Sequence, residues 1–227
     1  MADPVFPKHF DGRRFYNPNA PQARGFIDAL RWKLTSHPEQ SPPFIEDVVA
    51  SVPPRSVGAS QIRVTMVNHS TVFVQRSGFS LLTDPIWSER ASPLSWVGPK
   101  RRRKPGVRME DLPPIDAVLI SHNHFDHLDL PTLRQLPTRG RSIFVVAARC
   151  GRLLRSQRIE FVHELDWGES LAISGVTIHC APALHFSAGS IFDRNKTLWC
   201  GYVIEYPASL VYFAGDTSFG SHFATGG

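Results

Sequence analysis

The sequence predicts a layered α/β fold, an α+β arrangement in which sheets are flanked by helices. Short apolar or alternating segments separated by turn residues recur over 61–83 and 142–214, which is typical of antiparallel strands. Between these two regions an apolar strand leads through a polar loop into a short helix, as in a crossover connection. With 227 residues, the chain is long enough for one domain with a substantial core.

The first 58 residues form a distinct, proline-rich arm. Nine prolines within them preclude long regular elements. We expect one helix over 24–34, because Phe26, Ile27 and Leu30 follow one side of it. The arm is predicted to pack on the outside of the core, and residues 59–227 are predicted to form the domain.

The remaining elements follow from hydrophobic periodicity. A hairpin-type turn at 76–78 separates two of the predicted strands. Helices are expected over 130–136 and 149–156. Strands are expected over 62–67, 71–75, 79–83, 116–120, 142–147, 159–162, 170–173, 176–181, 198–204 and 210–214.

The stretch with the clearest chemistry is the loop between the predicted strand 116–120 and the predicted helix 130–136. Three histidines and a carboxylate lie within the six residues from His122 to His127. In extended backbone the side chains of His122 and His124 point the same way and can reach one metal ion, whereas Asp126 and His127 follow where the chain turns and can reach a second. Imidazole and carboxylate groups suit Zn²⁺, and also Fe or Mn. The loop therefore predicts a metal site rather than a solvated polar turn.

Asp129 is a plausible N-cap for the helix that follows this loop, with Pro131 in the first turn.

Composition indicates the charge of the expected partners and the compartment of the protein. The net charge of +5 favours anionic substrates or surfaces. The odd number of cysteines, Cys150, Cys180 and Cys200, without a CxxC pair, indicates reduced and buried thiols. The N-terminus shows no signal peptide, and no apolar run approaches the ~20 residues of a membrane span. These features predict a cytoplasmic protein.

The HxHxDH pattern at 122–127 resembles the signature of the metallo-β-lactamase superfamily. The flanking sequences are similar to its N-acyl-phosphatidylethanolamine-hydrolysing phospholipase D branch, and the resemblance runs from about residue 60 to residue 220. The residues that carry it are LTDPIW at 82–87, RASP at 90–93, GPKR at 98–101, LPPIDAVLISHNH at 112–124 and FAGDT at 213–217. It implies a sandwich of two sheets with helices outside, αββα.

The resemblance also implies how the ligands are divided between two zinc ions. The first would take His122, His124 and His185, and the second would take Asp126 and His127, with Asp216 shared. Two ions about 3.5–4 Å apart can hold a hydroxide, since each lowers the pKa of bound water toward ~7. That hydroxide would attack a phosphorus or carbonyl centre.

Further residues acquire roles from the same resemblance. Asp84 would orient a metal-binding histidine, and His69 would act near the metal centre, in catalysis or on the substrate. Asp126 would also orient the attacking water or carry its proton.

The loop 87–108 is basic and carries two tryptophans. Trp87 and Trp96 precede the run Lys100-Arg101-Arg102-Arg103-Lys104. Indole beside clustered arginine suits a phosphate-bearing ligand or an anionic lipid surface, so Trp87, Arg101 and Arg102 are the predicted substrate-binding residues. The same pairing could suit nucleic acid, but no nucleic-acid motif accompanies it. Nucleic acid is therefore not expected as a partner.

The chain departs from the family at its C-terminus. It ends eleven residues after Asp216 (227 − 216 = 11), where family members continue with a further αβ half that carries a late histidine ligand. His222 comes too soon to be that ligand. We therefore expect a chain that resembles the N-terminal portion of such an enzyme, with one metal if it is truncated, and with uncovered strands that favour a homodimer or aggregation.

The leading hypothesis is a hydrolase that cleaves a phosphodiester of phospholipid type, N-acyl-phosphatidylethanolamine phospholipase D-like, with a small-molecule or phospholipid substrate and peripheral contact with an anionic membrane. A lactonase of the ascorbate-6-phosphate kind is the alternative enzyme. A truncated metal-binding remnant without turnover is the non-enzymatic alternative.

Overall fold

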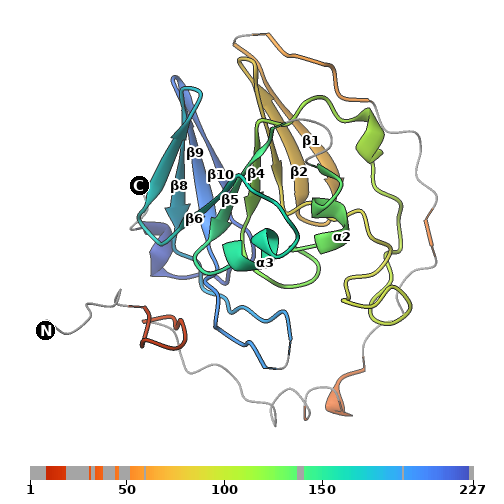
Figure 1. The fold of residues 1–227 in the computed structure, drawn as a ribbon, viewed down its shortest axis with the longest axis vertical. Coiled ribbons are helices and arrows are strands. Elements are labelled where there is room, and N and C mark those ends of the chain that lie inside the picture. Colours follow the sequence, from red (N-terminus) through yellow and green to blue (C-terminus); the bar gives the residue numbers. More distant parts are fainter. Residues whose placement is uncertain are drawn as a thin grey trace, which may run out of the picture.

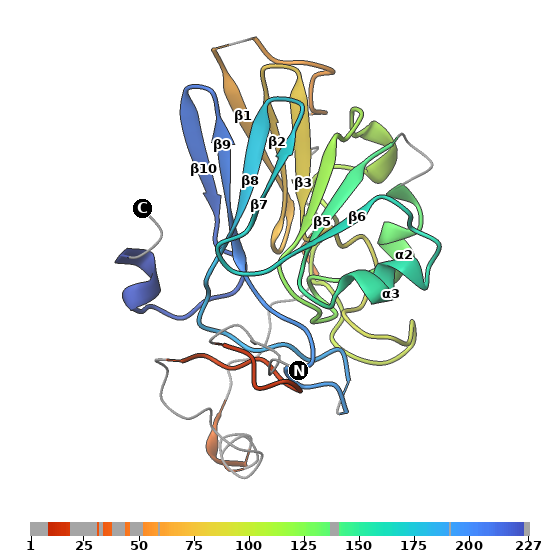
Figure 2. The same cartoon turned by 60° about the vertical axis from the view of Figure 1, so that its left-hand side comes forward.

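Two β-sheets face each other in the computed structural model, which describes residues 9–18, 31, 34–37, 44–45, 52–58, 60–136, 141–190 and 192–224 (Figures 1 and 2). The larger sheet has six strands in the order β1-β2-β3-β4-β5-β6, and the smaller has four in the order β10-β9-β8-β7. The predicted layered α/β fold is confirmed.

The larger sheet is mixed. Its first two pairings are antiparallel and its last three are parallel. The parallel connections carry the helices α2 (Leu130–Leu133) and α3 (Gly151–Arg155), and the 3₁₀ turn η1 (Met109–Asp111) precedes β4. The strands are β1 (Ile62–Asn68), β2 (Thr71–Arg76), β3 (Phe79–Thr83), β4 (Ala117–Ile120), β5 (Ile143–Ala147) and β6 (Val162–Leu165).

The smaller sheet is antiparallel throughout and is formed by the later part of the chain. Its strands are β7 (Ser170–Ile173), β8 (Val176–Ala181), β9 (Gly201–Tyr206) and β10 (Ser209–Phe213), followed by the 3₁₀ turn η3 (Ser221–Ala224). The long loop between β8 and β9 runs below the two sheets (Figure 1).

The core of the molecule includes all of β4. That strand is fully buried, as expected for a parallel strand with neighbours on both sides. The buried Tyr202 on β9 ties the smaller sheet to the larger, because its hydroxyl donates to the carbonyl of Ile120 at 2.9 Å. Cys150, Cys180 and Cys200 are free and buried, as predicted.

Several elements differ from their predicted bounds, among them the strand expected over 198–204, which is found at Gly201–Tyr206. The strand expected over 159–162 is found at Val162–Leu165, because Val162 is the residue that pairs with Phe144 of β5. The helix expected over 130–136 ends its regular part at Leu133. The Asp129 side chain does not cap it through a backbone N–H, since its carboxylate accepts bonds from Ser88 and Thr132 instead.

Part of the predicted arm contacts the core. Within 9–18, Phe10 and Phe15 are buried in the main hydrophobic cluster. Most of the predicted helix 24–34 lies outside the described residues. Within that range the structure describes Arg31 and Leu34, and both are helical. Across the described chain, no helix has the length and apolar character needed to cross a membrane.

Candidate metal centre

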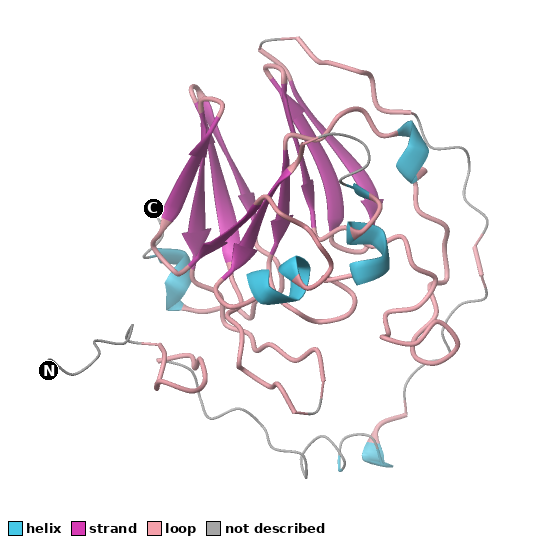
Figure 3. Ribbon diagram, in the orientation of Figure 1, coloured by secondary structure: helices cyan, strands magenta, loops and turns pink. Residues whose placement is uncertain are grey.

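The predicted site residues lie in loops that follow the ends of strands from both sheets. His69 follows β1, Asp84 follows β3, His185 follows β8 and Asp216 follows β10, and the cluster 122–127 follows β4. Figure 3 shows these strand ends leading into loops on one side of the molecule. Residues far apart in the sequence can therefore meet beneath the sheets.

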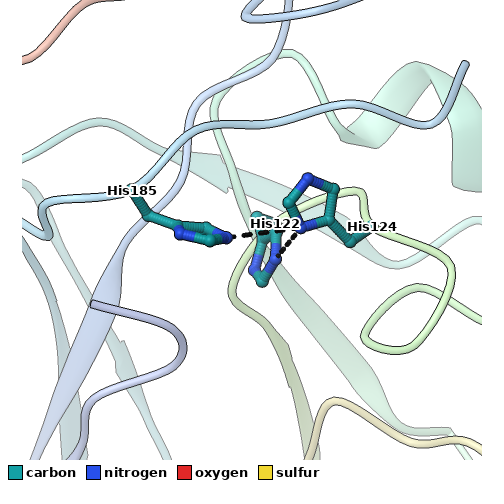
Figure 4. Close-up of side chains that lie close together, drawn as sticks. All are labelled: His122, His124 and His185. Carbon is teal, nitrogen blue, oxygen red and sulfur yellow. Dashed lines mark hydrogen bonds between the residues drawn. The ribbon is translucent and has the colours of Figure 1, made fainter. Parts of the chain in front are cut away.

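Three imidazoles converge at this position (Figure 4). The Nε2 atom of His122 lies 2.8 Å from Nδ1 of His124, and the Nε2 atom of His185 lies 3.3 Å from the same nitrogen. Nitrogens bound to one tetrahedral zinc ion lie about 3.3 Å apart, given Zn–N bonds of about 2.0–2.1 Å. The structure therefore brings together the three residues predicted to hold the first metal.

A second group of ligand atoms lies beside the three imidazoles. Nε2 of His127 is 3.4 Å from Oδ2 of Asp216 and 3.9 Å from Oδ2 of Asp126. The same Asp216 oxygen is 3.7 Å from Nε2 of His185. Asp216 thus lies between the two groups, where a shared carboxylate ligand would have to be.

One buried nitrogen supports the fit of a metal to this site. Nε2 of His127 is buried and has no hydrogen-bond partner, although Asp216 and Asp126 are nearby. A buried polar atom without a partner is costly, and a metal ion would satisfy it. The donor set consists of imidazole and carboxylate groups, which suits Zn or Fe.

Asp84 and Ser121 orient two candidate ligands, His127 and His122, through the Nδ1 atoms of their rings. The buried Asp84 carboxylate accepts bonds from Nδ1 of His127 at 2.7 Å and from the N–H and hydroxyl of Ser121 at 2.7 and 2.6 Å. The Ser121 hydroxyl also contacts Nδ1 of His122 at 2.9 Å. Because the Nδ1 atoms of both histidines are engaged, their Nε2 atoms are left to face the ligand cluster.

Local electrostatics keep three of the imidazoles neutral at neutral pH, which is the form that binds a metal. Burial lowers the pKa of His122 far below its usual range, and neighbouring histidines lower it further. Burial also lowers the pKa of His124, and burial together with electrostatic interaction with the neighbouring His124 side chain lowers the pKa of His185 to about 4.

The pKa values of His127 and Asp126 are shifted by their partners. Burial would lower the pKa of His127, but the carboxylates of Asp216 and Asp84 outweigh it and raise the pKa to about 10. Burial would raise the pKa of Asp126, but the hydrogen bond from His69 and the charge of His127 lower it to about 2. A metal at this site would therefore replace a proton on His127.

His69 lies at the junction of this centre and an open cleft. Its Nε2 is 3.2 Å from Oδ2 of Asp126, and its ring is 5.0 Å from that of His127. The cleft has a volume of about 610 Å³. Residues that line it include His69, Asp126, the apolar Met66, Val67, Ile86 and Ala91, and the basic run Lys100, Arg101, Arg102 and Arg103.

The predicted substrate residues are separated by the structure. Arg101 and the exposed Arg102 line the cleft. The guanidinium of Arg101 also donates to the carbonyls of Ser88 and Ile86, which holds the loop in place. Trp87 lines a different hollow and donates its indole N–H to the Val107 carbonyl, so it is not brought to the cleft that contains His69.

Two residues of the site were not singled out from the sequence. Ser121 carries no signal beyond its place at the end of a strand, although it contacts Asp84 and His122. Phe186 packs against the rings of His124 and His185, at 4.8 and 4.9 Å between centroids, and follows His185 directly in the sequence.

Comparisons with known proteins agree with this geometry. Residues 80–224 match the family model described as a beta-lactamase superfamily domain. The chain belongs to the beta-lactamase superfamily. The predicted resemblance to the metallo-β-lactamase superfamily is thereby confirmed.

Relatives of this superfamily member include an uncharacterised protein of Mycobacterium tuberculosis, 39% identical over 194 residues, which cover 85% of this chain and 52% of that protein. The N-acyl-phosphatidylethanolamine-hydrolyzing phospholipase D 1 of Caenorhabditis elegans is 36% identical over 170 residues, 70% of this chain and 48% of that one. The chain thus spans about half the length of these curated relatives.

A solved structure with the same fold is that of CmlA, a diiron beta-hydroxylase from Streptomyces venezuelae. It is 27% identical, with a TM-score of 0.52 over 69% of this chain and 30% of CmlA. A diiron protein therefore shares this fold.

Proposed function

We propose that this superfamily member is a zinc-dependent hydrolase that cleaves a phosphodiester of phospholipid type. The observation that carries the proposal is the convergence of two ligand groups on Asp216, with His185 on one side of its carboxylate and His127 on the other. Zinc is proposed because it takes imidazole and carboxylate ligands, and the dominance of imidazoles in the donor set disfavours manganese.

A bound metal pair would supply a hydroxide nucleophile at neutral pH and stabilise charge on the transferring oxygens. The chain's own groups then hold and orient the reactants. Asp126, ionised because of its lowered pKa, can accept a hydrogen bond from a water at the site. His69 contacts Asp126 at the mouth of the cleft, which suits a role in orienting that carboxylate or the substrate.

The chemistry of the cleft supports an anionic, amphipathic substrate. The residues that line the cleft include basic side chains, among them Arg102 and Arg103, and the apolar side chains of Met66, Val67 and Ile86. Arginine suits a phosphate group and apolar side chains suit an acyl chain. The name of the Caenorhabditis elegans relative points to the same substrate class.

Contact with an anionic membrane is part of this proposal. Leu94, Trp96 and Val97 are exposed, with Trp96 75% accessible, next to the basic run 100–104. Indole and cationic side chains together suit the interface of an anionic bilayer. We expect the chain to sediment with phosphatidylserine vesicles and much less with phosphatidylcholine vesicles, and Trp96→Ala to weaken that binding.

Metal analysis of the full chain, combined with a substrate panel, tests the proposed activity. We expect up to two zinc ions per chain and release of phosphatidic acid species from an N-acylated phosphatidylethanolamine. His122→Ala and Asp216→Ala should lose both metal and turnover. Absence of metal, or turnover unchanged by both substitutions, would reject the proposal.

The same panel separates the alternatives by product. Ring-opened acid from a lactone, without cleavage of a phosphodiester, would favour the lactonase. Metal near one equivalent with no turnover on any substrate would favour a metal-binding module.

A further inference from the structure

We propose that Asn17 is a positioning residue for the candidate metal ligand His185. Its side chain holds the backbone from which the His185 imidazole reaches the ligand cluster. The inference rests on the proposed metal site, and it assigns to the N-terminal segment 9–18 a part in that site beyond packing on the core.

The amide of Asn17 bridges a buried indole and the His185 backbone. Its Nδ2 donates to the His185 carbonyl at 2.7 Å, and its Oδ1 accepts from Nε1 of Trp199 at 3.2 Å. The indole N–H can only donate and the carbonyl can only accept, so a single orientation of the amide satisfies both. Trp199 is buried and also donates to the Ala183 carbonyl at 2.9 Å, which fixes the indole.

His185 needs such support because it lies beyond the end of β8, where the sheet no longer holds the backbone. The preceding residue, Leu184, is tied to the loop after β10: its N–H donates to the Thr217 hydroxyl, and its carbonyl accepts from the Ser218 N–H, each at 2.9 Å. The His185 carbonyl is tied instead to the N-terminal segment by Asn17. The two attachments together define where the imidazole lies.

The segment that carries Asn17 is itself anchored. His9 pairs with Asp166 at 2.6 Å and stacks on Trp167, with 4.2 Å between ring centroids. The N–H of the buried Phe15 donates to the Asn195 carbonyl at 2.8 Å, in the loop that follows His185. Figure 2 shows this segment, in red, alongside that blue loop. These contacts hold the backbone of segment 9–18 in place, and therefore also the position of Asn17.

Zinc affinity of the full chain, measured by competition with a chromophoric chelator, tests this role. Asn17→Asp keeps the size and the acceptor for Trp199 but replaces the donor to His185 by an oxygen. We expect its zinc dissociation constant to rise about tenfold, as for other residues that orient metal ligands. Asn17→Ala, which introduces no charge, should show a rise of similar size. Arg13→Ala is the matched control, because Arg13 is exposed in the same segment and its backbone N–H contacts Asp11.

The melting temperature of the chelator-treated protein separates positioning from folding. The inference is supported if Asn17→Asp or Asn17→Ala weakens zinc binding while the metal-free melting temperature stays near that of Arg13→Ala. It is overturned if zinc affinity matches the wild type in both variants, or falls only in proportion to lost metal-free stability. A wild-type chain that binds no zinc would overturn the metal site itself, and this inference with it.

Discussion

Asp84 is the residue on which the ligand loop depends most directly. Its carboxylate is fully buried and accepts bonds from Ser121 and from His127. Its φ of +32° is unusual for a residue other than glycine, although aspartate and asparagine tolerate such backbone better than most. The buried carboxylate is satisfied because three donors converge on it, and those donors in turn orient two candidate ligands.

We predict that Asp84→Asn lowers metal affinity about 10–100-fold. Asparagine tolerates the positive φ of position 84. However, its NH₂ group cannot accept a hydrogen bond, so it faces a donor in place of one carboxylate oxygen. Chelator competition measures the effect. Asp116→Asn is the control, since Asp116 also accepts a backbone bond, from Ser80 at 2.7 Å, away from the ligand cluster. Equal metal affinity in the two variants would contradict the role of Asp84.

The sequence indicated the candidate ligands unevenly. His122, His124, Asp126 and His127 lie within six residues, so their spacing alone indicated a site. His185 and Asp216 became ligands only through the family resemblance, because a single histidine or aspartate after a strand has many ordinary explanations. Asn17 and His185 are 168 residues apart in the sequence, so no local sequence pattern can predict their contact.

At the scale of elements, the ends of β4 and β10 meet through Gly215. This glycine has a φ of +59°, and a Cβ there would lie 2.8 Å from Cβ of Ser121 and 2.9 Å from the Cys200 carbonyl. Gly215 therefore permits the close approach that places Asp216 next to the loop after β4. The turn between β2 and β3 shows the contrast: Gly78 has a φ of +80°, but nothing lies within 4 Å of its Cβ position.

We predict that Gly215→Ala weakens zinc binding whereas Gly78→Ala does not. Each substitution carries the backbone strain of a left-handed residue, of the order of 1 kcal/mol. Only Gly215→Ala adds a clash that moves Asp216 away from His127 and His185. Urea unfolding and zinc titration of the two variants measure the two effects, and a similar loss of zinc affinity in both would be evidence against this account.

Strand positions were predictable where alternation and turns coincide, as for β1 to β3. The sequence Ile-Glu-Phe-Val at 159–162 alternates equally well, yet the strand begins at Val162. The Ile159 N–H instead bonds to the Leu154 carbonyl at the end of α3, and pairing with β5 sets the register. Tertiary contacts of this kind decide between local patterns of equal quality.

At the scale of the whole molecule, metal should stabilise the fold, because the ligands join loops from both sheets. We predict that zinc at 100 times its dissociation constant raises the free energy of unfolding by about 2.7 kcal/mol. The gain should disappear on addition of a chelator and in His124→Ala. Thermal unfolding with and without zinc measures it, and an unchanged midpoint in the wild type would refute a site that spans the two sheets.

The outer strands of the two sheets lead to the last prediction, which concerns self-association. In the described part of the chain β1 pairs with β2 and β10 pairs with β9, so each has an open edge. Apolar side chains on these strands are exposed: Val64 by 61%, Met66 by 59% and Leu210 by 67%. Open edges with apolar side chains favour pairing between chains.

We therefore expect the isolated chain to form dimers or larger species at micromolar concentration, as measured by analytical ultracentrifugation. Val64→Lys combined with Leu210→Lys should shift it toward monomer, since charge on an edge strand opposes pairing. Val97→Lys is the control, because Val97 is exposed in a loop. If the wild type, the double variant and Val97→Lys all sediment as monomers, the exposed strands do not drive association. If only Val97→Lys shifts toward monomer, the contact between chains involves the basic loop and not the edge strands.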